Sequence, residues 1–208
     1  MRPDSLREEL RLEQEMLARY KTGGISNFAP NPIQREFLNA TAEYREICLT
    51  GGRQTTGKTY PLTAWVAIVM SGRYPKWYTG KRWDRPVRGG GGSKVARLTR
   101  DNFCRYLAGP ETERGTGWIP RDCFENIERD IVPMTGGVRG QIDKIRCKWF
   151  DSAGIFGGWS ELYIFSYDGG RENIQSIPFD FVALDEEPAI EVKQELSART
   201  DKTLGPTS

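Results

Sequence analysis

The chain has 208 residues, enough for one well-packed domain, and its 38% apolar and 11% aromatic residues argue against a disordered chain. Its formal net charge of +2 does not by itself indicate nucleic-acid binding. The absence of histidine excludes Ser-His-Asp triads, Cys-His pairs and histidine-ligated metals, so any chemistry must use carboxylates, Lys, Arg, hydroxyls and a bound cation.

Cysteine usage and hydropathy indicate the redox environment of the chain and whether it contains a membrane span or a signal peptide. The four cysteines form no CxxC pair, which argues against a zinc site and fits a reducing, intracellular environment. There is no run of about 18 apolar residues, so we expect no membrane span. The charged N-terminus lacks the apolar core of a signal peptide.

Hydrophobic periodicity and Gly/Pro punctuation predict alternating helices and strands. The predicted helices cover residues 4–20, 33–43, 58–71, 99–108 and 189–198. The predicted strands cover residues 47–49, 145–150, 162–166 and 179–184, with the second and third joined as a hairpin through residues 154–158. Strands interspersed with helices imply an α/β layer fold.

Two glycine-rich segments interrupt this pattern. Residues 23–32 are typical of a linker or turn. Gly89 to Gly92 are four consecutive glycines, which suit either a flexible loop or a strand that another group approaches closely.

A phosphate-binding motif is predicted directly before the third helix. The eight residues that fit G-x-x-x-x-G-K-[ST] are Gly52, Arg53, Gln54, Thr55, Thr56, Gly57, Lys58 and Thr59. Such a loop points backbone N–H groups at phosphate oxygens, and the following helix presents its positive end to them. Lys58 would contact the β- and γ-phosphates, and the Thr59 hydroxyl would ligate Mg²⁺. The alternative is an ordinary glycine-rich turn.

A second motif, FVALDEE at residues 181–187, is an apolar strand that ends in carboxylates. A parallel strand beside the phosphate loop would bring Asp185 near the Mg²⁺ ion, and Glu186 could then orient and deprotonate an attacking water. The alternative is a strand end with solvated acids. Together the two motifs indicate an ATP hydrolase with a glutamate base. They argue against a kinase, because the sequence shows no separate acceptor site.

Two further side chains are candidates for nucleotide contacts. Gln34 carries both a donor and an acceptor, so it can pair with the adenine edge, which favours ATP over GTP. Arg53 can neutralise γ-phosphate charge within its own subunit, unless it is a solvent-facing loop residue.

These motifs, together with SYDGGRENIQS at residues 166–176, resemble the ATPase domain of the large terminase subunit of tailed double-stranded DNA bacteriophages. The resemblance covers about residues 30–190. It implies a P-loop NTPase of the ASCE type with a mostly parallel central sheet flanked by helices. Residues 1–29 would form an N-terminal helix and linker, and residues 30–208 the ATPase domain.

The resemblance also implies roles for residues and partners. The family's Walker A lysine falls on Lys58, its Mg²⁺ hydroxyl on Thr59, its Walker B aspartate on Asp185 and its catalytic glutamate on Glu186. Its basic Walker A residue falls on Arg53, and its adenine glutamine on Gln34. ATP hydrolysis would drive double-stranded DNA into a procapsid in the host cytoplasm. A homo-oligomeric ring would act there with the portal protein and the small terminase subunit, without a membrane.

The chain departs from the family pattern in two ways. Some terminases carry an arginine before the Walker B strand that acts on a neighbour's ATP; Gln175 stands there, and Arg171 is the substitute candidate. Large terminases also continue into a nuclease domain. We expect that domain to be missing here by truncation, and we expect no DNA cleavage by this chain.

Two other functions stay open at this point. One is a P-loop switch or scaffold that binds ATP and hydrolyses it negligibly. The other is a helicase-like nucleic-acid ATPase, although the downstream helicase motifs are not seen.

Overall fold

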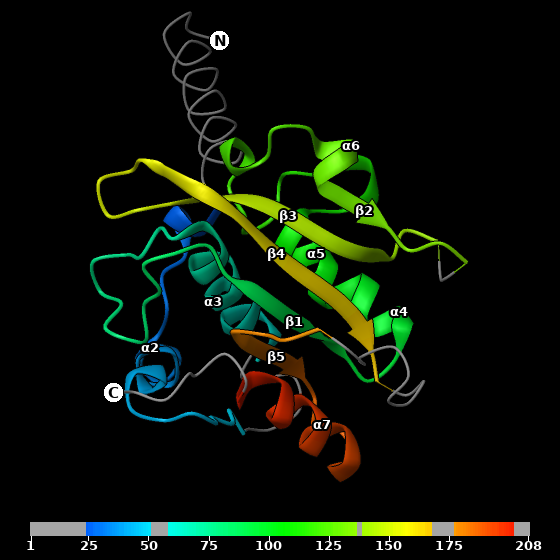
Figure 1. The fold of residues 1–208 in the computed structure, drawn as a ribbon, viewed down its shortest axis with the longest axis horizontal. Coiled ribbons are helices and arrows are strands. Elements are labelled where there is room, and N and C mark those ends of the chain that lie inside the picture. The colour runs from blue at the N-terminus through cyan, green and yellow to red at the C-terminus, as the bar shows by residue number, and fades with distance from the viewer. Residues whose placement is uncertain (1–23, 51–57, 137–138, 168–176, 202–208) are drawn as a thin grey trace, which may run out of the picture.

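A computed structural model describes residues 24–50, 58–136, 139–167 and 177–201 (Figure 1). Within them lies one five-stranded sheet in the order β2-β3-β4-β1-β5. The strands are β1 (Arg88–Ser93), β2 (Ile131–Pro133), β3 (Ile142–Phe150), β4 (Phe156–Ser166) and β5 (Phe181–Asp185). Strand β1 is parallel to both β4 and β5, whereas β3 is antiparallel to β4 and β2 to β3. The expected α/β class is confirmed, but the sheet is parallel over only one half.

Helices flank this sheet. The α-helices are α2 (Pro32–Asn39), α3 (Thr59–Ser71), α4 (Ala96–Leu98), α5 (Arg105–Ala108), α6 (Ile127–Asp130) and α7 (Ile190–Asp201). A π-helical segment, η3 (Thr99–Cys104), joins α4 to α5. The 3₁₀ turns are η1 (Gly24–Asn27), η2 (Ala40–Ala42), η4 (Glu111–Glu113) and η5 (Arg121–Cys123). Four of the predicted helices and the predicted hairpin are therefore present, while the helix predicted over 4–20 lies outside the described residues.

Helix α3 is the centre of the main core. Ten of its thirteen residues are buried, because its sequence is apolar on nearly every side. The helix ends at Gly72, whose φ of 70° is the left-handed conformation that glycine adopts easily. Burial of this kind fixes the helix, and with it the position of its first residue, Thr59.

The two faces of the sheet bury different clusters. On β4, Leu162 and Ile164 belong to the main core, whereas Phe165 belongs to a second cluster with Val192 and Leu196 of α7. This follows from the strand geometry, in which successive side chains point to opposite faces. The main core also contains α3, so α3 and α7 cover opposite faces of the sheet (Figure 1).

The four glycines lie in β1, an interior strand between β4 and β5, so the strand is the correct one of the two alternatives. Aromatic rings lie where their side chains would be: a Cβ at Gly89 would lie 2.3 Å from a ring atom of Phe181. A Cβ at Gly91 would lie 2.6 Å from a ring atom of Phe103. Residues 89–92 are thus a buried strand that bulky side chains approach closely.

The predicted strand at residues 47–49 is wrong. These residues pair with no strand of the described sheet, and Cys48 is exposed. The physical reason is that a strand needs hydrogen bonds from a neighbour, which a three-residue apolar run does not specify.

Part of the expected linker is packed on the domain. Ile25 and Phe28 are buried in the main core, and the Ile25 amide donates a 2.9 Å hydrogen bond to the Trp118 carbonyl. The domain boundary at residues 29 and 30 stays a prediction. None of the helices in the described part of the chain is long and apolar enough to span a bilayer.

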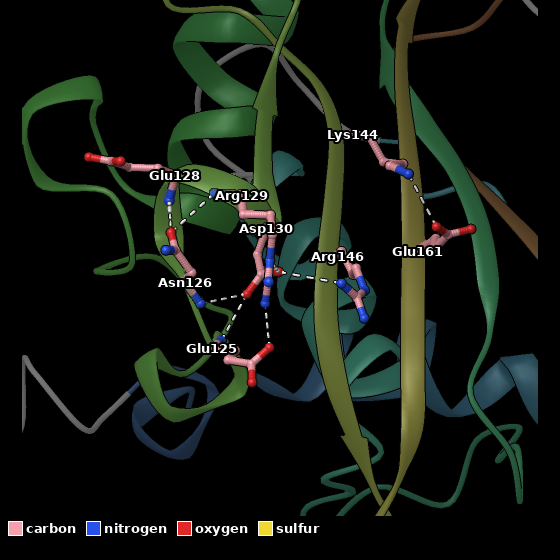
Figure 2. A network of polar contacts seen from close by, with 8 residues as sticks. All are labelled: Glu125, Asn126, Glu128, Arg129, Asp130, Lys144, Arg146 and Glu161. Atoms are coloured by element: carbon pink, nitrogen blue, oxygen red, sulfur yellow. Dashed lines mark hydrogen bonds and ion pairs between the residues drawn. The ribbon is translucent and has the colours of Figure 1, made fainter.

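A polar network stabilises the antiparallel half of the sheet (Figure 2). The carboxylate of Asp130, fully buried, accepts hydrogen bonds from the amides of Glu125 and Asn126 at 2.8 and 2.9 Å. Across β3 and β4, the Lys144 ammonium lies 3.2 Å from the Glu161 carboxylate. The network contains none of the predicted site residues, so we assign it to stability.

Candidate functional site

The candidate site lies at the carboxyl edge of the parallel strands. Strands β4, β1 and β5 run in one direction, so their last residues meet at one edge of the sheet. The register places Ser93 beside both Ser166 and Asp185. Ligands of α/β proteins bind characteristically outside the carboxyl ends of such strands.

Two predicted site residues are in direct contact at this edge. The hydroxyl of Thr59, the first residue of α3, donates a 2.9 Å hydrogen bond to Oδ1 of Asp185, which is 126 residues away in the chain. The Ser93 hydroxyl lies 3.4 Å from the other carboxylate oxygen. The start of α3 and the acidic end of β5 therefore form one polar cluster.

The position of Ser93 has a structural cause of its own. Its backbone amide donates a 3.1 Å hydrogen bond to the hydroxyl of Thr99, which is buried in η3. The Thr99 hydroxyl in turn lies 3.1 Å from the Val95 carbonyl, to which it donates. These two hydrogen bonds hold the turn after β1 and so fix Ser93 beside Asp185.

Burial raises the pKa of Asp185 above the ordinary aspartate value. The hydrogen bonds from Thr59 and Ser93 and the positive charge of Lys58 act in the opposite direction. Lys58 is exposed and directly precedes α3. Ionisation of Asp185 therefore lowers the free energy of unfolding, and a bound cation would offset this loss.

We expect Asp185→Asn to raise the free energy of unfolding at pH 7 in the absence of divalent metal. A raised pKa in the folded state means that ionisation favours unfolding above that pKa, and the amide removes this penalty. The gain should vanish as the pH falls below the unfolded-state pKa, where the wild-type carboxyl is protonated in both states. Urea denaturation at pH 7 and pH 3 measures it, and a pH-independent difference would contradict the explanation.

Glu186 follows β5 with an unusual backbone. Its φ is 83°, a left-handed conformation, and its side chain is exposed. The hydroxyl of Tyr167 lies 2.7 Å from the carbonyl oxygens of both Asp185 and Glu186 and shares its one proton between these two acceptors. Glu186 is predicted from the sequence as a site residue, whereas Ser93 and Tyr167 are not. Ser93 ends β1 and Tyr167 directly follows β4. These positions point to the site only once the order of the strands in the sheet is known.

The Gln34 side chain caps the start of helix α2. Its side-chain oxygen accepts a 3.1 Å hydrogen bond from the Asn31 amide, and the Asn31 side chain accepts one of 2.9 Å from the Gln34 amide. This reciprocal pair is a capping box at the start of α2. Helix capping accounts for this glutamine, and its contact with adenine stays a prediction.

Several predicted site residues lie outside the described part of the chain. They are Gly52, Arg53, Gln54, Thr55, Thr56, Gly57, Arg171 and Gln175. The phosphate loop and the trans-acting arginine therefore stay predictions. Within the described ranges, no three His, Cys, Asp or Glu side chains converge as metal ligands.

Comparison with known proteins adds a relative. The terminase large subunit of Salmonella phage P22 is 30% identical to this chain over 194 residues. The chain is a homologue of part of a phage terminase large subunit. The match covers 86% of this chain and 38% of the P22 protein, so the chain spans well under half of that relative's length. No family model matches the chain, and no solved structure does either.

Proposed function

We propose that the chain is the ATPase motor domain of a viral terminase large subunit, which hydrolyses ATP to move double-stranded DNA into a procapsid. The observation that carries this proposal is the hydrogen bond between Thr59 and Asp185. A hydroxyl at the start of a buried helix and a carboxylate at the end of a parallel strand meet where a P-loop NTPase binds its nucleotide and metal. The similarity to the P22 large subunit supports the packaging role.

The residues at this contact fit a magnesium ion. A hydroxyl and a carboxylate are hard oxygen donors, and Mg²⁺ usually takes one or two carboxylates, with waters and substrate phosphates completing its shell. Thr59 and Asp185 would hold the ion, with Ser93 steadying the carboxylate. When bound, the ion neutralises charge on the phosphates.

The chain's own residues divide the remaining work. Lys58 lies at the positive end of α3 and would hold the β- and γ-phosphates of ATP there. The loop from Gly52 to Gly57 would surround those phosphates with backbone N–H groups. Glu186 would accept the proton of the attacking water. Arg53 and Arg171 would neutralise charge as the γ-phosphate leaves, and Gln34 would contact the adenine.

The partners follow from the packaging role. We propose that the chain acts on double-stranded DNA in a homo-oligomeric ring, with the portal protein and the small terminase subunit, in the host cytoplasm.

Replacing Lys58 with alanine should weaken binding of Mg²⁺-ATP roughly 10- to 100-fold, because a charge-assisted hydrogen bond contributes about 1.5–3 kcal/mol. Titration with a fluorescent ATP analogue measures the dissociation constant. Lys76→Ala is the matched control, since Lys76 is also exposed and follows the opposite end of α3. Unchanged affinity in Lys58→Ala would remove the phosphate-binding assignment.

A further inference from the structure

The backbone of Glu186 is held in a conformation that its own residue type disfavours. Among the described residues, it alone combines a side chain with a positive φ, of 83°. L-residues with a long side chain rarely adopt this region, and they persist in it only where the surrounding structure holds them. Something next to Glu186 must therefore supply that restraint.

The hydroxyl of Tyr167 is the group in position to do so. It lies 2.7 Å from two consecutive carbonyl oxygens, those of Asp185 and Glu186. In an extended strand, successive carbonyls point in opposite directions, so two of them converge on one donor only if the chain turns between them. The left-handed Glu186 makes that turn.

The Tyr167 ring is itself immobilised. The residue is 5% exposed and packs in the second cluster with Phe165, Phe179 and two residues of α7. A buried ring with two torsion angles places its hydroxyl with little freedom. The hydroxyl is therefore a fixed point to which the end of β5 is attached.

We propose that Tyr167 is a positioning residue for Glu186: its hydroxyl holds the Asp185–Glu186 backbone in the one conformation that directs the Glu186 carboxylate toward the attacking water. This inference rests on the proposed function. The backbone dihedral angles of Glu186 set the direction in which its side chain leaves the chain. The Asp185 carboxylate is held separately, by Thr59 and Ser93, so nucleotide and metal binding do not depend on Tyr167.

Tyr167→Phe removes one oxygen atom and keeps the ring in the second cluster. We expect the rate of ATP hydrolysis at saturating Mg²⁺-ATP to fall about 10-fold, since small displacements of a catalytic group cost about 10- to 100-fold in rate. The dissociation constant for Mg²⁺-ATP should change by less than about twofold. Single-turnover phosphate release by the whole chain, with double-stranded DNA present, measures the rate.

Tyr163→Phe is the matched control. Tyr163 lies on β4, which ends one residue before Tyr167, and its hydroxyl donates to the Glu161 carboxylate at 3.3 Å, away from the site. We expect the rate of this variant to equal that of the wild type. A wild-type rate in Tyr167→Phe would overturn the inference.

A double-mutant cycle separates positioning from general support of the fold. If Tyr167 acts through Glu186, adding Tyr167→Phe to Glu186→Gln should cause no further loss of the residual rate. A second 10-fold loss in that background would show a structural role and overturn the inference. Failure of the wild-type chain to bind Mg²⁺-ATP would overturn the proposed function as well, whereas binding and turnover unaffected by Tyr167→Phe would overturn this inference alone.

Discussion

Replacing Glu186 with glutamine should lower the rate of ATP hydrolysis by about 10²- to 10⁴-fold, the usual contribution of a general base. The amide keeps the size of the side chain but does not accept a proton. The dissociation constant for Mg²⁺-ATP should stay within about threefold of the wild-type value, because Glu186 is exposed at the end of β5 and the contact between Thr59 and Asp185 does not include it. Phosphate release and equilibrium binding of a fluorescent ATP analogue measure the two quantities.

Glu187 offers a matched control for this variant. It is the adjacent exposed acid, so Glu187→Gln makes the same chemical change one residue away. We expect its rate to stay close to that of the wild type. Equal rates in Glu186→Gln and the wild type would contradict the assignment of the base.

The same experiments separate the alternative functions. A scaffold or switch would be indifferent to Glu186→Gln, because it uses binding and not turnover. A helicase-like ATPase would separate the strands of a DNA duplex in the presence of ATP. Hydrolysis that double-stranded DNA stimulates, without strand separation, would favour the packaging motor.

Replacing Gly92 with alanine should lower the free energy of unfolding by about 3 kcal/mol. A Cβ at this position would lie 1.8 Å from the carbonyl oxygen of Phe165, its register partner on β4. Overpacked cores usually lose about 1–3 kcal/mol, and a clash with backbone in the middle of a sheet lies at the upper end of that range. The strand ladder would have to separate next to Ser93, so the site should be disturbed as well.

Gly90→Ala is the matched control for this prediction. Gly90 is buried on the same strand, but a Cβ there would lie 3.1 Å from ring atoms of Phe165 and Phe179, which are side chains that can shift. We expect this variant to lose about 2 kcal/mol less than Gly92→Ala. Urea denaturation of both variants gives the comparison. Equal losses would show that the close approach of the β4 backbone does not limit this strand.

Helices and hairpins of this fold can be predicted from the sequence, because the residues that determine them are close together in the chain. Helix α3 was predicted within one residue of its start, since a continuous apolar run that follows a glycine and ends at one needs no distant partner. The hairpin of β3 and β4 was predicted for the same reason, because the glycines of its turn separate two strand-forming runs. The predicted strand at residues 47–49 failed, because its existence depended on a neighbour that three residues do not specify.

The glycines of β1 show what sequence patterns lack. A glycine run has no alternation of apolar and polar side chains, so neither burial nor strand formation is encoded in it. The rings that fill the space belong to residues such as Phe103 and Phe181, and only the folded sheet brings them to the strand. Whether residues 89–92 form a loop or a strand could therefore be decided only from the structure.

By itself, the sequence determined which chemical groups the chain offers: a Lys-Thr pair at the start of an apolar helix and an Asp-Glu pair at the end of an apolar strand. Only the tertiary structure decided that Thr59 contacts Asp185, that Ser93 joins them, and that Tyr167 holds the Glu186 backbone. The physical reason is that motif chemistry resides in neighbouring residues, whereas contacts across a parallel sheet depend on the order in which strands pair. No short stretch of sequence records that order.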